Sequence, residues 1–194
     1  MMRHWQYLKY VIRHKWFVFR EGRKLGVPFL TLILHDWDKF APDEWFPYAR
    51  TFYKSNGEKQ YIESVYFARA WMKHQHRNKH HWQYWLTRLG GTPIRKTNIV
   101  VWDRGDAQAI EERETVGGPV LDLVDCAFGI FADPMPDVYR REMLADWRGA
   151  GLALGFPDTA GWYVKNCNNM ILHPETRAWI EAQLGIESES NDVR

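Results

Sequence analysis

The sequence has little of what marks a secreted, membrane-spanning or thiolate-metal protein. Only two of its 194 residues are cysteines, Cys126 and Cys167, and they lie far apart without a C-x-x-C spacing. A disulfide framework or a zinc site built on thiolates is therefore not expected. No apolar run approaches the roughly 18 residues that a membrane span needs. The basic N-terminus also lacks the apolar stretch and cleavage site of a signal peptide. These absences favour a cytoplasmic protein with no membrane contact.

The sequence also lacks a strong excess of charge of either sign. Its net charge is +2 with the eight histidines neutral, which does not favour nucleic acid as a partner. Basic side chains are frequent between Arg3 and Lys24. A bound anion and a solvated surface explain that local excess equally well.

Aromatic residues, by contrast, are abundant. They make up 15% of the chain and include 11 Trp, within a hydrophobic share of 45%. This composition can bury a substantial core in one domain, which we place at residues 1–185, followed by a polar tail at 186–194. The aromatic surplus suits cores and pocket walls and is also compatible with a homodimer.

The hydrophobic pattern predicts an all-α protein with one irregular segment. Helices are predicted over residues 2–24, 28–38, 42–53, 58–89, 137–154, 157–171 and 174–184. The segment 92–134 differs in character, because residues 98–102 are strand-like and 103–105 can form a turn. We interpret this segment as an inserted β-hairpin or loop module.

The most informative residues are His35 and Asp36, which follow the apolar run 26–34. Burying either side chain without a partner costs on the order of several kcal/mol, which a binding partner must offset. A metal ion would satisfy both, because imidazole nitrogen and carboxylate oxygen are ordinary ligands of first-row metals.

Four histidines follow in the predicted helix over 58–89. At 100° per residue, His74, Asn78 and His81 lie within about 60° of one another on the apolar face and need partners there. His76 and His80 point nearly the opposite way, toward a basic, solvent-exposed face. His76 and His80 are four residues apart, a spacing that could bind a metal, but their exposed position does not favour it.

Two carboxylates and one further histidine complete the candidate set. Glu142 and Asp146 are one helical turn apart at the edge of an apolar stripe, where an acid needs a cation. A salt bridge to Arg148 or to a base of the first helix is the simpler explanation. His14 lies among aromatic residues, where a lone histidine is usually a hydrogen-bonded core residue.

The order of these residues is more specific than any one of them. His14, then His35 and Asp36, then Asp146 give the order H…HD…D, in which the chain resembles the HD superfamily of metal-dependent phosphohydrolases. Three longer patterns resemble a family of small bacterial and phage proteins of the HD type. They are HDWDKF at 35–40, HHWQYW at 80–85 and EMLADWRGA at 142–150.

The resemblance covers roughly residues 8–90 and 136–185 and leaves out the inserted segment. It implies an all-α, HD-domain-like helical bundle with a small insertion around 92–134. It also implies that four residues hold one divalent cation, namely His14, His35, Asp36 and Asp146. Many members bind a second ion, for which His74, Asn78 and His81 are placed as ligands or as residues around the ligands.

Some features of this metal site stay open. Asp122 and Asp125, in the segment that the resemblance does not cover, are alternatives to Asp146. Ligands of this kind accept Mn, Fe, Co, Ni, Zn or Mg, so the sequence does not name the metal.

The implied function is hydrolysis of a nucleotide or a related phosphate ester by metal-activated water. Lys39 lies one turn after His35 and is the first candidate for a phosphate contact, with an ion pair to a neighbouring acid as the alternative. Glu142 is a candidate general base or orients a ligand. Arg77 and Trp82 are weaker candidates for substrate binding. Two other hypotheses stay open: a di-iron oxygenase on a similar scaffold, and a non-catalytic metal-binding or interaction protein.

Overall fold

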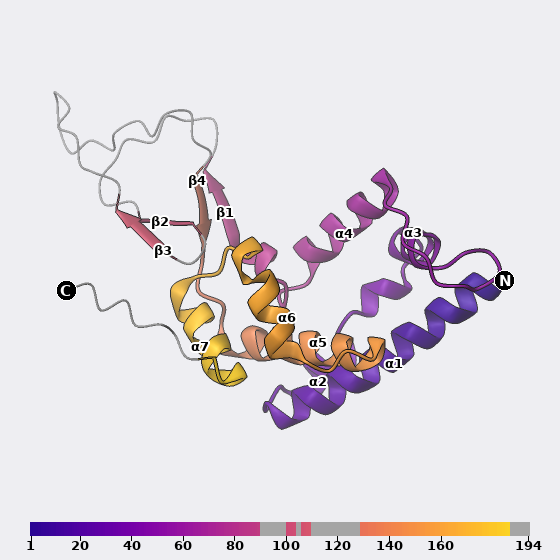
Figure 1. The fold of residues 1–194 in the computed structure, drawn as a ribbon, viewed down its shortest axis with the longest axis horizontal. Coiled ribbons are helices and arrows are strands. Elements are labelled where there is room, and N and C mark those ends of the chain that lie inside the picture. Colours follow the sequence, from indigo (N-terminus) through magenta and orange to yellow (C-terminus); the bar gives the residue numbers. More distant parts are fainter. Residues whose placement is uncertain (90–99, 104–105, 110–128, 187–194) are drawn as a thin grey trace. The chain divides into compact units, whose positions relative to one another are not determined.

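A computed structural model describes residues 1–89, 100–103, 106–109 and 129–186 (Figure 1). Within these residues the protein is mostly helical, with seven α-helices and two small antiparallel two-stranded sheets. The chain forms two compact units, one of Met1–Tyr84 with Pro136–Thr159 and one of Trp85–Met135 with Ala160–Arg194. The prediction of a helical protein with a small β-structured segment is thus confirmed.

The first unit is helical and carries all of the described candidate ligands. Its elements are α1 (Met2–Lys24), α2 (Phe29–Leu34), η1 (Trp37–Phe40), α3 (Pro42–Phe52), α4 (Val65–Arg77), η2 (Trp82–Trp85) and α5 (Asp137–Leu154). The predicted helices over 2–24, 42–53 and 137–154 are confirmed. Pro42 occupies the first turn of α3, where its missing N–H costs nothing, and Gly155 ends α5 in the left-handed conformation.

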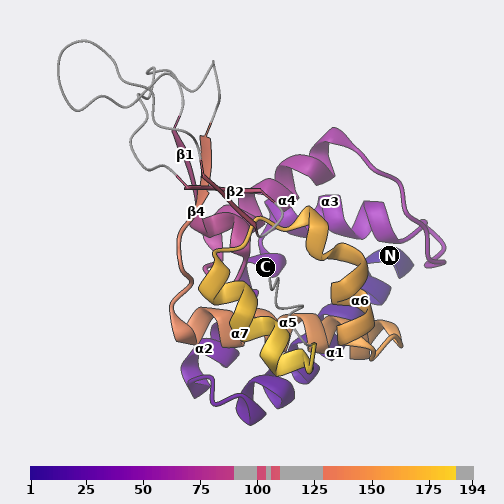
Figure 2. The same cartoon turned by 60° about the vertical axis from the view of Figure 1, so that its left-hand side comes forward.

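Helices α1 and α5 lie side by side and antiparallel in both views (Figures 1 and 2). Near one end of the pair, Arg141 donates a 3.0 Å hydrogen bond to the Leu25 carbonyl. Further along, Gly149 lies so close to α1 that a Cβ atom there would be 2.7 Å from the Val18 backbone nitrogen. This close approach sets the spacing between the two helices near the candidate ligands.

An aromatic core joins α1, α3 and α4. Its buried members are Tyr7, Val11, Tyr48, Ala49, Tyr53 and Ala70. Trp45 packs edge-on against Tyr7 with ring centroids 4.8 Å apart, and its indole nitrogen donates a 2.9 Å hydrogen bond to His4 Nδ1. Tyr48 lies edge-on to His74, with centroids 6.3 Å apart. The aromatic core therefore packs against His74, one of the candidate ligands.

The single long helix predicted over 58–89 is wrong, because α4 covers only the middle of that range. Ser64 caps α4, since its hydroxyl accepts a 3.1 Å hydrogen bond from the Phe67 backbone N–H. Asn78 ends the helix with an extended backbone, and Leu86–Leu89 forms strand β1. Serine and asparagine favour helix ends over helix interiors, and that signal should have outweighed the apolar period.

The second unit combines short strands and helices. Its further elements are β2 (Val100–Asp103), β3 (Asp106–Ala109), β4 (Gly129–Ala132), α6 (Thr159–Asn166), η3 (Cys167–Asn169) and α7 (Pro174–Leu184). Strand β1 pairs antiparallel with β4, with Leu86 opposite Ala132, and β2 pairs antiparallel with β3. The Thr176 hydroxyl accepts a 3.1 Å hydrogen bond from the Met135 N–H, which joins α7 to the chain after β4.

Predictions for this unit agree with the structure in part. The strand expected at 98–102 is present from Val100, and the helix expected over 174–184 is confirmed. The helix expected over 157–171 is shorter, because α6 ends at Asn166 and gives way to η3. Much of the proposed 92–134 module lies outside the described residues.

None of the helices in the described part of the chain is both long enough and apolar enough to cross a membrane.

Candidate metal centre

Asp36 lies at a sharp bend between α2 and η1. The helix predicted over 28–38 ends at Leu34 instead, and Asp36 adopts the left-handed conformation, with φ 53° and ψ 30°. This conformation costs an L-residue about 1–2 kcal/mol, although aspartate tolerates it better than most. Side chains of consecutive helical residues point about 100° apart. The bend instead lets His35 and Asp36 enter the same buried space, where they are 2% and 0% exposed.

One oxygen of the Asp36 carboxylate, Oδ2, faces one ligand from the long helix α1 and one from the bend after α2. It lies 3.3 Å from His14 Nε2 and 3.4 Å from His35 Nε2. Asp146 Oδ1 lies 3.1 Å and 3.5 Å from the same two nitrogens. The structure therefore brings together the four residues of the H…HD…D order, and we name them the first cluster.

The other oxygen of Asp36, Oδ1, faces histidines at and beyond the end of α4. It lies 3.3 Å from His74 Nε2 and 3.2 Å from His80 Nε2. His81 is near enough to offer a further ligand atom. We name Asp36, His74, His80 and His81 the second cluster. All of its side chains are buried, and Asp36 belongs to both clusters.

The prediction that His80 faces solvent beside His76 is wrong. It assumed a continuous helix, but α4 ends at Arg77 and the chain then turns, with the His81 N–H donating a 3.0 Å hydrogen bond to the Asn78 carbonyl. The turn reverses the direction of His80, which is only 2% exposed. His76 remains inside the helix and is exposed, as predicted.

Carboxylates lie on the far side of three of these imidazole rings. Glu142 Oε1 is 3.0 Å from His35 Nδ1 and 3.4 Å from His80 Nδ1. Glu44, fully buried on α3, has Oε2 3.0 Å from His74 Nδ1. A proton shared at Nδ1 leaves Nε2 as the nitrogen that can bind a metal, an arrangement typical of metal-ligating histidines. Glu142 thus fits the orienting role that sequence analysis offered as one of two.

Two acidic residues at the site, Glu44 and Asp38, were not predicted from the sequence. Asp38 Oδ2 lies 3.2 Å from His74 Nδ1 and accepts a 2.6 Å hydrogen bond from Asn78. Asn78 therefore lies behind His74 and does not face the Nε2 atoms. An acid in the first turn of a helix is favourable in any case, so the position of Glu44 gave no separate signal of a role at the site.

The two clusters concentrate charge in a buried space. Burial alone would raise the pKa of Asp36, but the surrounding cations, led by His35 and Lys39, hold that pKa well below its usual range. Burial opposes protonation of the histidines, yet Asp36 raises the pKa of His35 to about 9 and that of His74 to about 11. His81 differs, because burial and the neighbouring histidines hold its pKa well below the usual value. A lowered pKa favours the neutral imidazole, which is the form that binds metals.

The residues present fit a divalent metal ion. Several atoms inside the clusters make no hydrogen bond within the described residues, namely His35 Nε2, Asp36 Oδ1, His74 Nε2, His80 Nε2 and His81 Nε2. Buried polar atoms are nearly always paired, and a bound ion accounts for such exceptions. Two ligands about 2.05 Å from one ion at a tetrahedral angle lie about 3.3 Å apart. The N–O distances around Asp36 are 3.2–3.4 Å.

Lys39 and Arg77 occupy different environments. Lys39 is buried and forms an ion pair with Asp36 Oδ2, which is the alternative that the sequence left open. Arg77 is exposed and pairs with Asp43 at 3.0 Å and with Glu44 at 3.1 Å. A phosphate contact by either residue stays a prediction.

The remaining candidates are less informative. Trp82 is half-buried in η2, next to His81 in the chain, and its role in substrate binding stays a prediction. Asp122 and Asp125, the alternatives to Asp146, lie outside the described residues.

Comparison with known proteins gives one finding. No curated protein and no solved structure matches the sequence. One family model matches residues 3–186, a range that contains every member of both clusters, and it is described as a family of unknown function. The match thus adds no substrate or reaction to the geometry. The chain belongs to this family, DUF5662.

Proposed function

We propose that the protein is a metal-dependent phosphohydrolase whose catalytic centre is the pair of clusters joined by Asp36. The observation that carries this proposal is the Asp36 carboxylate itself. Each of its oxygens faces two imidazole nitrogens of a different cluster, at 3.2–3.4 Å. A carboxylate so placed can be shared by two adjacent ions, as in hydrolases that use two metals.

The two clusters would divide the ligands between two sites. The first ion would be held by His14, His35, Asp36 and Asp146, and the second by Asp36, His74, His80 and His81. Bound there, divalent ions would lower the pKa of a coordinated water and polarise a phosphoryl oxygen. The nitrogen and oxygen donors, with no thiolate among them, suit Mn, Fe, Co, Ni, Zn or Mg.

The carboxylates behind the histidines keep the centre in its binding geometry. Glu142 lies against Nδ1 of both His35 and His80, one from each cluster, so it orients both rings at once. Glu44 does the same for His74 alone. Through its ion pair with Glu44, Arg77 acts as a positioning residue. The substrate contact expected of Arg77 from the sequence stays a separate prediction.

Lys39 supplies positive charge next to the centre. It is the one lysine placed against Asp36 Oδ2 within the described residues, and its side chain is mostly withdrawn from water. A fixed cation in a buried site stabilises charge that develops on a phosphoryl group more strongly than one in water. Lys39 is therefore the proposed phosphate contact, and a nucleotide or another phosphate ester is the proposed substrate.

A second candidate function is oxygen chemistry at a pair of iron ions. The two clusters contain seven buried or nearly buried His and Asp side chains, namely His14, His35, Asp36, His74, His80, His81 and Asp146. A ligand set of this size also suits two irons. Iron bound in the purified protein, together with O₂ consumption and no phosphate release, would favour this function.

The test combines metal analysis with a phosphate-release screen. The purified protein is reconstituted with each candidate metal and tested against nucleotides and simple phosphate esters. We expect His35→Ala and Asp36→Ala to lose both bound metal and phosphate release. His76→Ala, a matched control on the exposed face of α4, should keep both. Full metal occupancy in the first two variants would contradict the site. Metal binding without phosphate release from any substrate would contradict the hydrolase.

A further inference from the structure

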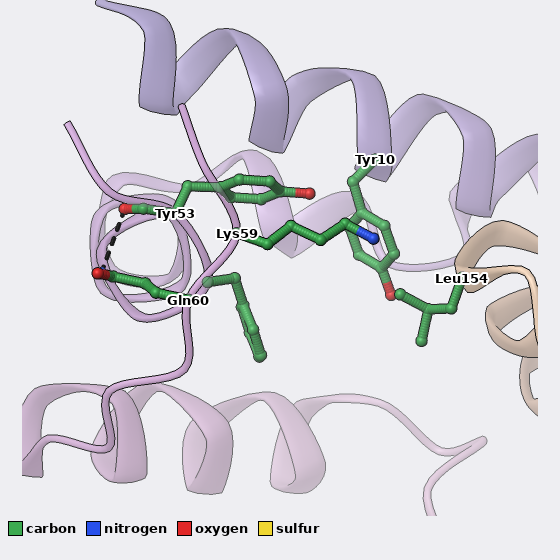
Figure 3. Close-up of a pocket in the computed structure, with 6 residues that line it drawn as sticks. Tyr10, Tyr53, Lys59, Gln60 and Leu154 are labelled. Atoms are coloured by element: carbon green, nitrogen blue, oxygen red, sulfur yellow. Dashed lines mark hydrogen bonds between the residues drawn. The ribbon is translucent and has the colours of Figure 1, made fainter. Parts of the chain in front are cut away.

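A pocket with aromatic walls opens within the first unit (Figure 3). Its volume is about 230 Å³, and it is lined by Tyr10, Phe52, Tyr53, Lys59, Gln60 and Leu154. Most of these side chains are apolar or aromatic. Small-molecule sites typically have such walls, with a few polar groups that fix orientation. Neither metal cluster contributes a residue to the pocket, so it needs a separate explanation.

The pocket lies next to the first cluster. Tyr10 forms part of its wall and also stacks on His14, with ring centroids 5.9 Å apart and planes 18° apart. Tyr10 and His14 are one turn apart on α1, or about 6 Å along the helix axis. Leu154 closes the pocket from the last residue of α5, the helix that carries Asp146. One aromatic ring thus joins the pocket wall to a candidate ligand.

The polar groups of the pocket indicate what it binds. The Gln60 side-chain amide is held in place, because its Nε2 donates a 2.7 Å hydrogen bond to the Arg50 carbonyl. Lys59 is exposed, and its side chain extends toward Tyr10 in Figure 3. Among the described residues no carboxylate lies within ion-pair distance of Lys59. Its ammonium group is therefore available to an oxygen atom of a bound molecule.

We infer that this pocket receives the organic group of the substrate, and that this group is an aromatic ring bearing an acidic or carbonyl oxygen opposite Lys59. The inference rests on the proposed function, because the phosphoryl group would lie at the metal centre. The rings of Tyr10, Phe52 and Tyr53 would contact the aromatic ring face to face or edge to face. The volume of about 230 Å³ suits one ring system.

The geometry also fits the leaving group of the reaction. Hydrolysis breaks the bond between phosphorus and the ester oxygen and forms a bond between phosphorus and the oxygen of water. One proton of the water goes to the ester oxygen that leaves with the ring, and the other stays with the phosphate. A ring bound beside Tyr10, which stacks on His14, would place the ester oxygen on the side of the first cluster and so position the bond that breaks.

Two substitutions test separately the binding of the aromatic ring and the binding of the oxygen that it bears. Leu154 is 47% exposed at the end of α5, so Leu154→Trp can fill the pocket without disturbing the core. Lys59→Met removes the charge and keeps the length of the side chain. Val164→Trp, at an exposed apolar position on α6, controls for the added bulk.

Binding is measured by calorimetry on the metal-loaded protein with three phosphonates that cannot be hydrolysed. The probes are ethylphosphonate, phenylphosphonate and 4-phosphonobenzoate. We expect phenylphosphonate to bind about tenfold more tightly than ethylphosphonate, because the ring buries apolar area. The added carboxylate should improve the affinity by a further two- to fivefold or so, as an exposed ion pair does.

The variants should then act selectively. Leu154→Trp should weaken both ring compounds about tenfold and leave ethylphosphonate unchanged. Lys59→Met should remove only the advantage of the carboxylate. If Leu154→Trp proves unstable, the assignment of the pocket is still tested by the order of the three affinities in the wild-type protein and by the effect of Lys59→Met.

Different results would contradict the assignment of the pocket and the proposed hydrolase function. Equal affinities for the three probes, or equal effects of Leu154→Trp on all of them, would overturn the assignment of the pocket while leaving phosphate release by the wild-type protein intact. Absence of phosphate release from every ester by the metal-loaded wild-type protein would overturn the proposed function itself.

Discussion

The two clusters that share Asp36 are built in different ways. The first takes His14 and Asp146 from the middle of long, antiparallel helices, where close packing at Gly149 fixes their separation. The second takes His80 and His81 from a turn after a helix end. Packing of regular helices positions the first cluster. Buried carboxylates lie against two histidines of the second cluster, His74 and His80, but against only His35 of the first. Removing a carboxylate should therefore affect the second cluster more.

The largest effect should come from the residue that both clusters share. Asp36→Asn keeps the shape of the side chain but removes the charge that faces the histidines on both sides. We expect loss of metal from both clusters. In the metal-free protein we expect the free energy of unfolding to fall by about 3–5 kcal/mol, since buried cations lose their partner. Metal analysis and urea denaturation measure the two effects, with the exposed Glu63→Gln as the control.

A smaller effect should follow when one cluster is changed at a time. His14→Ala removes a ligand of the first cluster only, and His80→Ala removes one of the second only. Each variant should bind about one ion per chain where the wild type binds two. Equilibrium dialysis with Mn²⁺ gives this ratio. If both variants lose both ions, the two clusters form one indivisible site and do not bind metal independently.

The carboxylates behind the histidines should have graded effects. Removing such a hydrogen-bonding partner typically lowers metal affinity about 10–100-fold. Glu44→Gln should weaken only the second cluster, because Glu44 contacts His74, whereas Glu142→Gln should weaken both, through His35 and His80. Calorimetric titration of metal-free protein resolves the two binding steps. Equal effects of both variants on both steps would show that the carboxylates act through general stability.

The smallest predicted effect concerns pH. In the metal-free protein the pKa of His35 is raised to about 9, above its value in an unfolded chain. The stability that this group contributes is therefore complete below about pH 6.5 and is lost as the pH rises toward 9. Metal binding needs neutral imidazoles and should strengthen over the same range. Thermal unfolding with and without Mn²⁺ between pH 6 and 9 should show opposite trends. Parallel trends would mean that metal does not compete with these protons.

The difference between the two clusters also explains which features of the site could be predicted from the sequence. The order of His14, His35, Asp36 and Asp146 was readable because two long helices carry the first and last of these residues, and His35 and Asp36 directly follow an apolar run. The left-handed bend at Asp36 was not readable, since nothing in the apolar run before it requires the helix to end at Leu34. The bend is what lets two adjacent side chains face the same site.

The second cluster was predicted except for His80, since Asp36, His74 and His81 were all named as candidates. His74 was identified from its place on the apolar face of a helix, and that face is correct. His80 was placed on the wrong side because the helical period was extended past Asn78, where the chain turns. Glu44 was missed because an acid in a first helical turn needs no further partner to be favourable. Local periodicity places His74 correctly inside a regular helix, but the direction of His80 depends on a turn that the periodicity does not show.

The central claim is that Asp36 joins two metal ions in one centre. The most direct test is electron paramagnetic resonance during titration of metal-free protein with Mn²⁺. We expect two ions per chain and the spectrum of an exchange-coupled pair, because ions that share a carboxylate lie about 3.5–4 Å apart. Glu63→Gln should give the same spectrum, and Asp36→Asn should not. A six-line spectrum of isolated Mn²⁺ at full occupancy of the wild-type protein would contradict the claim.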